Sequence, residues 1–179
     1  RKLHNSSWGY VCPSETPEGA SVGIVKNLAM VCEITNYYPI DAITYLLDGL
    51  LVKLDDIDIY NFNKSNHVRL FINGHLMGYT NKPCNITDLL KLNRSNGTIN
   101  IYTSIELDIH NQNIIIYTDA GRCTRPLLKV KNDSLVIEEY LDRLSSLSWN
   151  TLLTSAIDIP KQCIEYIDIH EVNSLLLSN

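Results

Sequence analysis

The densest group of residues that could take part in chemistry lies at residues 12–26, in the sequence CPSETPEGASVGIVK. This stretch offers the carboxylates of Glu15 and Glu18, the hydroxyl of Thr16 and the ammonium group of Lys26. A rigid polar loop held by a buried anchor is a common way for a protein to place a few such side chains. The sequence therefore predicts a polar loop that presents a few groups at a defined point.

The stiffness of this polar loop (residues 12–26) follows from its prolines and glycines. Pro13 and Pro17 fix φ and restrict the residue before each, while Gly19 and Gly23 permit turns that other residues resist. The apolar residues between positions 22 and 30 are expected to lead the chain back into a core.

A second candidate group opens the chain, where Arg1, His4 and Trp8 lie close together in sequence. Basic and aromatic side chains of this kind suit phosphate and base contacts. A solvated edge with one buried tryptophan explains the same residues equally well, so both interpretations stay open at this point.

Other patterns do not indicate catalysis by the chain alone. The acidic stretch at residues 55–58 lacks the glycine and the final glutamate of a calcium loop, which favours a solvated acidic loop. The sequence contains no HExxH, no GxSxG, no Walker loop and no dinucleotide fingerprint. We therefore expect a free-standing chain to be inactive and to bind no cofactor.

Composition sets further bounds. The 179 residues are 45% hydrophobic, enough for a real core, and a net charge of −5 argues against nucleic-acid binding over the whole surface. No run of 18 apolar residues occurs, so no membrane partner is expected. The cysteines are widely spaced without a CxxC pair, which predicts reduced, buried thiols of an intracellular protein: Cys12, Cys32, Cys84, Cys123 and Cys163.

Four helices are expected from apolar spacing and capping signals. The first covers residues 41–52 with Asp41 as N-cap, and the second begins at Pro83 or with Asn85 as its cap, runs to residue 93 and is ended by Asn96-Gly97. The other two cover residues 137–147 and residues 149–156, the last capped by Ser148. Residues 53–66 are acidic and then rich in Asn and Ser, and they are predicted to form a connecting loop.

Strands are expected from β-branched, alternating segments. Residues 67–72 and 75–79 form a hairpin around Asn73-Gly74, residues 101–109, 113–118 and 122–130 form three further strands, and residues 163–168 form the last. Ile109 is expected to be the last residue of a half-buried strand. Helices mixed with antiparallel hairpins predict an α+β fold.

Three stretches of the sequence match one family. The first is RKLHN at residues 1–5, followed by WG at 8–9, CPSETPEG at 12–19, Gly23 and VKNL at 25–28; the second is TDAGRCTRPL at 118–127; the third is WNTLL at 149–153 with EYID at 165–168. In these residues, and in their order and spacing, the chain resembles the second-largest subunit of multisubunit DNA-directed RNA polymerase, of the eukaryotic or viral type.

The resemblance implies an internal fragment of a large multidomain subunit, an interpretation that the start at Arg1 within a polar motif also favours. Residues 1–35 would belong to the fork region at the active centre, 36–147 to the first external domain, and 148–179 to the second. The implied partners are the largest polymerase subunit, other core subunits, the DNA template and the RNA–DNA hybrid. The catalytic magnesium would be held mainly by the largest subunit, and the location would be the nucleus, or the virion or host cytoplasm for a viral enzyme.

The resemblance also assigns roles to residues. Arg1 and Glu18 correspond to positions close to the family's active centre, and Glu18, being anionic, is expected to hold neighbouring basic groups or loop amides rather than phosphate. The residues expected near the active centre or nucleic acid are Arg1, His4, Glu15, Thr16, Glu18, Gly19 and Lys26. The residues expected to have structural roles are Trp8, Pro13, Pro17, Gly23, Asp119, Gly121, Arg122 and Arg125, with Asp119 and Arg122 forming an exposed ion pair at a turn.

The resemblance predicts a segment of a polymerase core subunit, which serves the active-centre and hybrid-binding region and the outer scaffold during DNA-templated RNA synthesis. The alternative is a free-standing interaction or nucleic-acid-binding module that has kept the polymerase motif.

Overall fold

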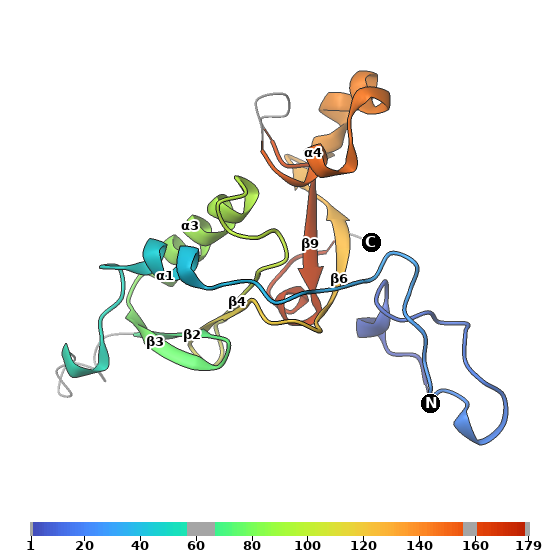
Figure 1. The fold of residues 1–179 in the computed structure, drawn as a ribbon, viewed down its shortest axis with the longest axis horizontal. Helices are drawn as coiled ribbons and strands as arrows, with labels where there is room; N and C mark the ends of the chain where they lie inside the picture. The colour runs from blue at the N-terminus through green and yellow to red at the C-terminus, as the bar shows by residue number, and fades with distance from the viewer. Residues whose placement is uncertain (1, 57–66, 156–160, 178–179) are drawn as a thin grey trace.

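A three-stranded and a four-stranded β-sheet form the framework of the chain, and the computed structural model describes residues 2–56, 67–155 and 161–177. Figure 1 shows β6 and β9 of the smaller sheet at the centre, the larger sheet with its helices on one side, and an N-terminal arm on the other. Helices and mixed sheets together confirm the predicted α+β class.

The four-stranded sheet consists of two hairpins in the order β3-β2-β5-β4. The first joins β2 (Val68–Ile72) to β3 (His75–Thr80) and the second joins β4 (Ser104–Asp108) to β5 (Asn113–Tyr117). The first hairpin and both strands of the second were predicted, and Asn73 and Gly74 have the positive φ values that a tight hairpin turn needs. The parallel pairing of β2 with β5 was not predicted, because it depends on packing between distant segments.

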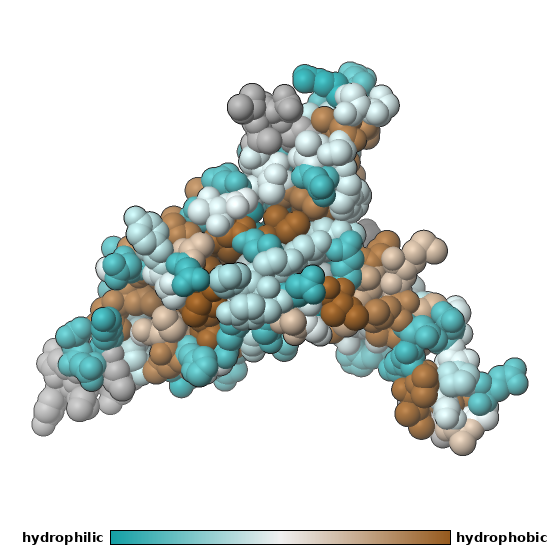
Figure 2. All heavy atoms as spheres, viewed as in Figure 1, coloured by the Kyte–Doolittle hydropathy of each residue, from teal (hydrophilic) through white to brown (hydrophobic). Residues whose placement is uncertain are grey.

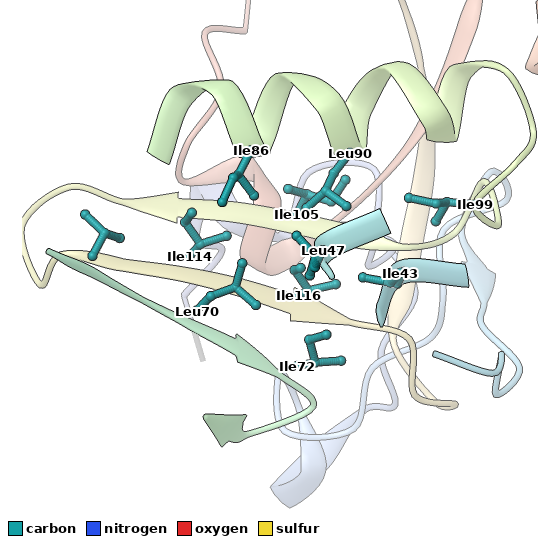
Figure 3. Close-up of a cluster of buried hydrophobic side chains, with 11 residues drawn as sticks. Ile43, Leu47, Leu70, Ile72, Ile86, Leu90, Ile99, Ile105, Ile114 and Ile116 are labelled. Carbon is teal, nitrogen blue, oxygen red and sulfur yellow. The ribbon is translucent and has the colours of Figure 1, made fainter. Parts of the chain in front are cut away.

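Two helices cover one face of this sheet. The helix α3 (Pro83–Ser95) begins at a proline, which suits the first helical position, and points Ile86 and Leu90 at the sheet. The shorter α1 (Asp41–Leu47) adds Ile43 and Leu47 to the same core. In Figure 3 these side chains meet those of the strands in one apolar layer.

Helix α1 differs from the prediction at both ends. Its N-cap is Ile40, so Asp41 is the first helical residue instead of the cap. It ends at Leu47 instead of residue 52, because Asp48 is extended and Gly49 has a φ of +73°. A short 3-10 helix, η3 (Leu54–Asp56), follows in the predicted loop, and residues 57–66 of that loop lie outside the described residues.

The three-stranded sheet has the order β1-β6-β9 and is antiparallel throughout. It combines β1 (Glu33–Ile34), β6 (Cys123–Leu128) and β9 (Ile164–Asp168). The predicted strand at 122–130 therefore pairs in a different sheet from its predecessors, and it stops at Leu128. A small hairpin of β7 (Val130–Lys131) and β8 (Ser134–Leu135) follows.

A second apolar cluster lies beside this sheet, under η4 (Val136–Ser146) and α4 (Trp149–Leu153), and includes Val136, Tyr140 and Leu152. A helix was predicted at 137–147, and η4 occupies this range with 3-10 turns instead of α-helical ones. The apolar spacing cannot separate the two, because both windings place residues three to four apart on one side. Ser148 occupies the predicted cap position of α4 without a side-chain cap bond.

Two more features differ from the expectations. Ile109 lies beyond the end of β4 and is 76% exposed, because Asp108 accepts hydrogen bonds from the backbone and side chain of Asn111 and closes the turn there. A short helix, α5 (Ile169–Val172), follows β9 directly and is capped by Asp168. None of the described helices has the length and apolar character that crossing a membrane requires.

Candidate active-centre loop and its support

The polar loop (residues 12–26) is closed at its base by backbone pairing. The amide of Cys12 donates to the carbonyl of Asn27 at 2.9 Å, the amide of Ala29 donates to the carbonyl of Tyr10 at 3.0 Å, and Val11 forms a bridge with Leu28. We call residues 10–12 and 27–29 the neck. Because the neck pairs two backbone segments, the loop projects from the rest of the chain as a single closed unit.

Thr16 braces the inside of the loop. Its hydroxyl accepts from the amide of Gly23 at 2.9 Å and donates to the carbonyl of Val25 at 3.1 Å. The side-chain amide of Asn27 also donates to the carbonyl of Glu15. Thr16 and Gly23, which sequence reasoning singled out separately, are thus direct partners.

The charged side chains of the loop face outward. Glu15, Glu18 and Lys26 are exposed, as are Pro13 and Pro17. Glu18 precedes the single turn η2 (Gly19–Ser21), and its side chain forms no cap hydrogen bond. Gly19 and Gly23 have φ values of +82° and +73°, a region that favours glycine. The loop can therefore offer carboxylate and ammonium groups to a partner.

The segment before the loop is only partly as expected. His4 caps the short helix η1 (Asn5–Ser7), where its Nδ1 accepts from the amide of Ser6. Trp8 is 69% exposed, so the interpretation with one buried tryptophan is wrong: the buried aromatic residue is Tyr10. Arg1 lies outside the described residues.

The apolar residues after the loop do not lead into a core, which corrects the prediction. Ile24, Val25 and Leu28 are each about half exposed or more, and Met30 is fully exposed. The arm extends away from both sheets, so no core surface lies beneath these side chains (Figure 1). Apolar side chains accordingly appear on the outside of the arm in Figure 2.

The second matched stretch forms a turn that is clasped by Thr35. The Thr35 hydroxyl donates to the carbonyl of Asp119 and accepts from the amide of Arg122, while its carbonyl accepts from the amide of Gly121. Thr118 in turn exchanges two hydrogen bonds with the side chain of Asn73. The turn therefore ties the start of the three-stranded sheet to the hairpin of the four-stranded sheet.

Arg122 is more buried than the predicted exposed ion pair allows. It pairs with Asp119 at 3.0 Å, but its side chain is only 8% exposed and it also pairs with buried Asp168 at 2.9 Å. Asp168 completes this arrangement by accepting from the hydroxyl of Ser104 at 2.8 Å. Arg122 thus connects a surface carboxylate to an interior one.

Sequence reasoning missed a second buried network around Arg94. The Arg94 side chain, 1% exposed, forms a two-pronged pair with Glu171 at 2.7 and 2.8 Å and also pairs with Glu165. A signal was present, since Arg94 continues the inward-facing row of Ile86 and Leu90 at intervals of four residues. A charged residue in that row indicates a buried partner.

Burial and pairing act in opposite directions on these groups. Burial alone would lower the pKa of Arg94, but Glu171 and Glu165 raise it well above its ordinary value. Burial alone would raise the pKa of Glu165, but the charge of Arg94 outweighs it and lowers that pKa. Both shifts favour the charged forms, so the network behaves as a set of ions.

The cysteines and acidic residues show no metal arrangement in the part of the chain that the structure describes, where no three His, Cys, Asp or Glu side chains are grouped to hold an ion. All five cysteines are free. Cys84 is exposed, which corrects the expectation that the thiols are buried, while Cys163 is fully buried. Fold and loop together define an α+β scaffold segment that presents a closed polar loop on an arm.

Comparison with known proteins identifies the family of this scaffold. Residues 1–34 match the model of RNA polymerase Rpb2, domain 3, and residues 70–131 match RNA polymerase Rpb2, domain 4. The DNA-directed RNA polymerase II subunit RPB2 of Eremothecium gossypii is 32% identical over 203 residues, covering 99% of this chain and 16% of the relative.

Similar relatives come from distant sources. RNA polymerase II subunit RPB2 of Encephalitozoon cuniculi is 35% identical over 96% of this chain and 15% of its own length. DNA-directed RNA polymerase subunit 2 of Acanthamoeba polyphaga mimivirus is 32% identical over 99% of this chain and 14% of its own length. The chain belongs to the family of second-largest subunits of DNA-directed RNA polymerase, and it spans 14–16% of the length of these relatives.

Proposed function

We propose that this chain is the segment of an RNA polymerase second-largest subunit that carries an active-centre loop and part of the outer scaffold. The loop is the polar loop at residues 12–26, and the scaffold comprises the two sheets with their helices. In this role the chain contributes to DNA-templated RNA synthesis, a nucleotidyl transfer that takes place only in the assembled enzyme.

The observation that carries the proposal is the form of the loop within the region that matches Rpb2 domain 3. Its neck is closed by backbone bonds, Thr16 braces its interior, and Glu15, Glu18 and Lys26 point outward. A braced loop with exposed charges can hold groups of another chain or of nucleic acid in place at low entropic cost.

Glu18 has a defined task in this proposal. A carboxylate would repel phosphate, so Glu18 holds basic side chains or amide groups that themselves face the nucleic acid. Lys26 and Arg1 supply positive charge for phosphate contacts from the same segment. His4 lies in the same stretch, and its Nδ1 is already used to cap η1.

The proposed partners are the largest polymerase subunit, other core subunits, the DNA template and the RNA–DNA hybrid. Magnesium would supply the two-metal chemistry of phosphoryl transfer from ligands on the largest subunit. The exposed apolar residues of the arm fit this picture, because apolar surface of this extent is normally covered in an assembly. The proposed location is the nucleus, or the virion or host cytoplasm for a viral enzyme.

The proposed domain boundaries are residues 1–35 for the fork segment, 36–147 for the first external domain and 148–179 for the second. The three-stranded sheet takes β1, β6 and β9 from these three segments in turn. Any relative motion of the segments would have to break that sheet, so we expect them to move together.

Purification of the tagged full-length protein from its source tests the proposal. We expect it to co-purify with a second large chain and to synthesise RNA that depends on template DNA and magnesium. A protein that purifies alone, binds nucleic acid and makes no RNA would support the free-standing binding module instead.

A further inference from the structure

Arg125 lies against the backbone of Gly9, although 116 positions separate the two residues. Gly9 has a φ of +79°, and a Cβ added to it would lie 2.7 Å from Cδ and 2.9 Å from Nη1 of Arg125. These distances are shorter than real Cβ contacts, so a larger residue would force the arginine side chain to shift, and the positive φ disfavours other residues in any case.

The same arginine packs on the residue that anchors the neck. Its guanidinium carbon lies 5.2 Å from the centre of the Tyr10 ring, within the range of a cation–π contact. Tyr10 is 2% exposed, and its hydroxyl donates to the carbonyl of Ile167 at 3.0 Å. Arg125 and Ile167 are partners in the β6–β9 register, so Tyr10 reaches across one strand pair.

Tyr10 in turn belongs to the neck of the polar loop, since its carbonyl accepts from the amide of Ala29. A continuous path therefore runs from β6 through Arg125 and Tyr10 to the paired backbone on which the loop is mounted. Arg125 Nε is a buried donor that has no hydrogen-bond partner in the described part of the chain.

We propose that Arg125 is a positioning residue for the polar loop: it fixes Tyr10, and through Tyr10 the direction in which the loop leaves the body. The effect on catalysis rests on the proposed function, whereas the effect on the neck does not. The proposal gives the second matched stretch two structural roles. Its residues 118–122 hold the two sheets together, and Arg125 orients the polar loop of the first matched stretch.

The test uses Arg125→Met in the full-length subunit of the assembled polymerase, with Arg143→Met, at an exposed position of η4, as the matched control. Hydrogen exchange at the amides of Cys12 and Ala29 should become about tenfold faster in Arg125→Met, while the amides of β5 exchange as in the wild type. Nucleotide addition should show kcat reduced about tenfold and a KM for nucleotide changed by less than about twofold, because misplacement affects the chemical step.

Two more variants separate positioning from bulk packing. Arg125→Lys keeps a cation over the ring, so its kcat should lie closer to the wild type than to Arg125→Met. Gly9→Ala pushes against the arginine and also strains the backbone at a φ of +79°, so it should speed exchange at the neck. Because only the push against the arginine is shared, the combined variant with Arg125→Met should change exchange by less than the sum of the two single effects.

The outcomes distinguish the two proposals. Unchanged exchange at Cys12 and Ala29 in Arg125→Met, or faster exchange that extends equally to β5, would overturn the positioning role. A wild-type complex that makes no RNA would instead refute the proposed function, while the exchange measurements would still decide whether Arg125 controls the neck.

Discussion

The guanidinium of Arg94 connects the helix that covers the four-stranded sheet to the three-stranded sheet, because it extends from α3 to carboxylates on β9 and α5. Removing an arginine from such a site leaves Glu171 buried without its counter-charge. The resulting loss of folding stability usually exceeds the net stabilisation that the intact pair provides. Stable folding therefore requires that α3 packs correctly against β9 and α5, so that these buried charges are paired.

Replacement of Arg94 tests this at the scale of one residue. We expect Arg94→Met to lower the free energy of unfolding by about 3–5 kcal/mol, because it strands buried carboxylates. Arg143→Met, on the exposed side of η4, is the matched control and should change it by no more than about 0.5 kcal/mol. Urea unfolding of the chain measures both, and equal effects would refute the importance of the buried network.

The lowered pKa of Glu165 predicts a pH dependence. Its carboxylate stabilises the folded chain above its ordinary pKa of 4.5, and this stabilisation is lost as the pH falls through the lower pKa of the folded state. Unfolding free energies measured from pH 6 down to pH 3 should therefore decline less steeply in Glu165→Gln than in the wild type. Parallel curves for the two proteins would contradict the assigned shift.

At the scale of elements, the structure agrees with the sequence wherever a local signal decides the outcome. Asn73-Gly74 specifies a turn by itself, and Pro83 marks the start of α3, so both the hairpin and the helix were predictable. The parallel contact of β2 with β5 and the move of β6 into another sheet depend on long-range packing, which no window of the sequence contains.

The core under α3 gives a prediction at this scale. Ile114, the second residue of β5, is completely buried, whereas Ile109 in the preceding loop is 76% exposed. Ile114→Ala should lower the free energy of unfolding by about 2–5 kcal/mol, as expected for a large-to-small change in a packed core. Ile109→Ala removes the same atoms from a solvated site, and an equal loss there would mean that the strand continues as first predicted.

At the scale of the whole molecule, the three matched stretches meet around one small sheet. Tyr10 of the first bonds to Ile167 of the third, and Arg125 of the second packs on Tyr10. The sequence marked these stretches as important but could not show that they touch, because contact between positions so far apart is decided by the fold. It also could not reveal Glu171, whose partner Arg94 lies outside every matched stretch.

The position of the polar loop on the molecule explains why its residues resisted physical interpretation from sequence alone. Loop stiffness was readable from prolines, glycines and hydroxyl groups, and Thr16 indeed braces the loop. In the proposed assembly the exposed charges would face surfaces supplied by other chains, and the same surfaces would cover the exposed apolar residues at 22–30. A sequence window predicts burial only when the covering surface lies in the same chain.

The nucleotide-addition rate of the assembled polymerase tests the central claim most directly, with Glu18→Ala compared against Glu138→Ala. Both glutamates are exposed in this chain, one in the polar loop and one on η4. Glu18→Ala should slow addition about tenfold or more, because small misplacements near a reacting centre cost up to ~100-fold, while Glu138→Ala should leave the rate unchanged. Equal rates for the two variants would contradict the assignment of the loop to the active centre.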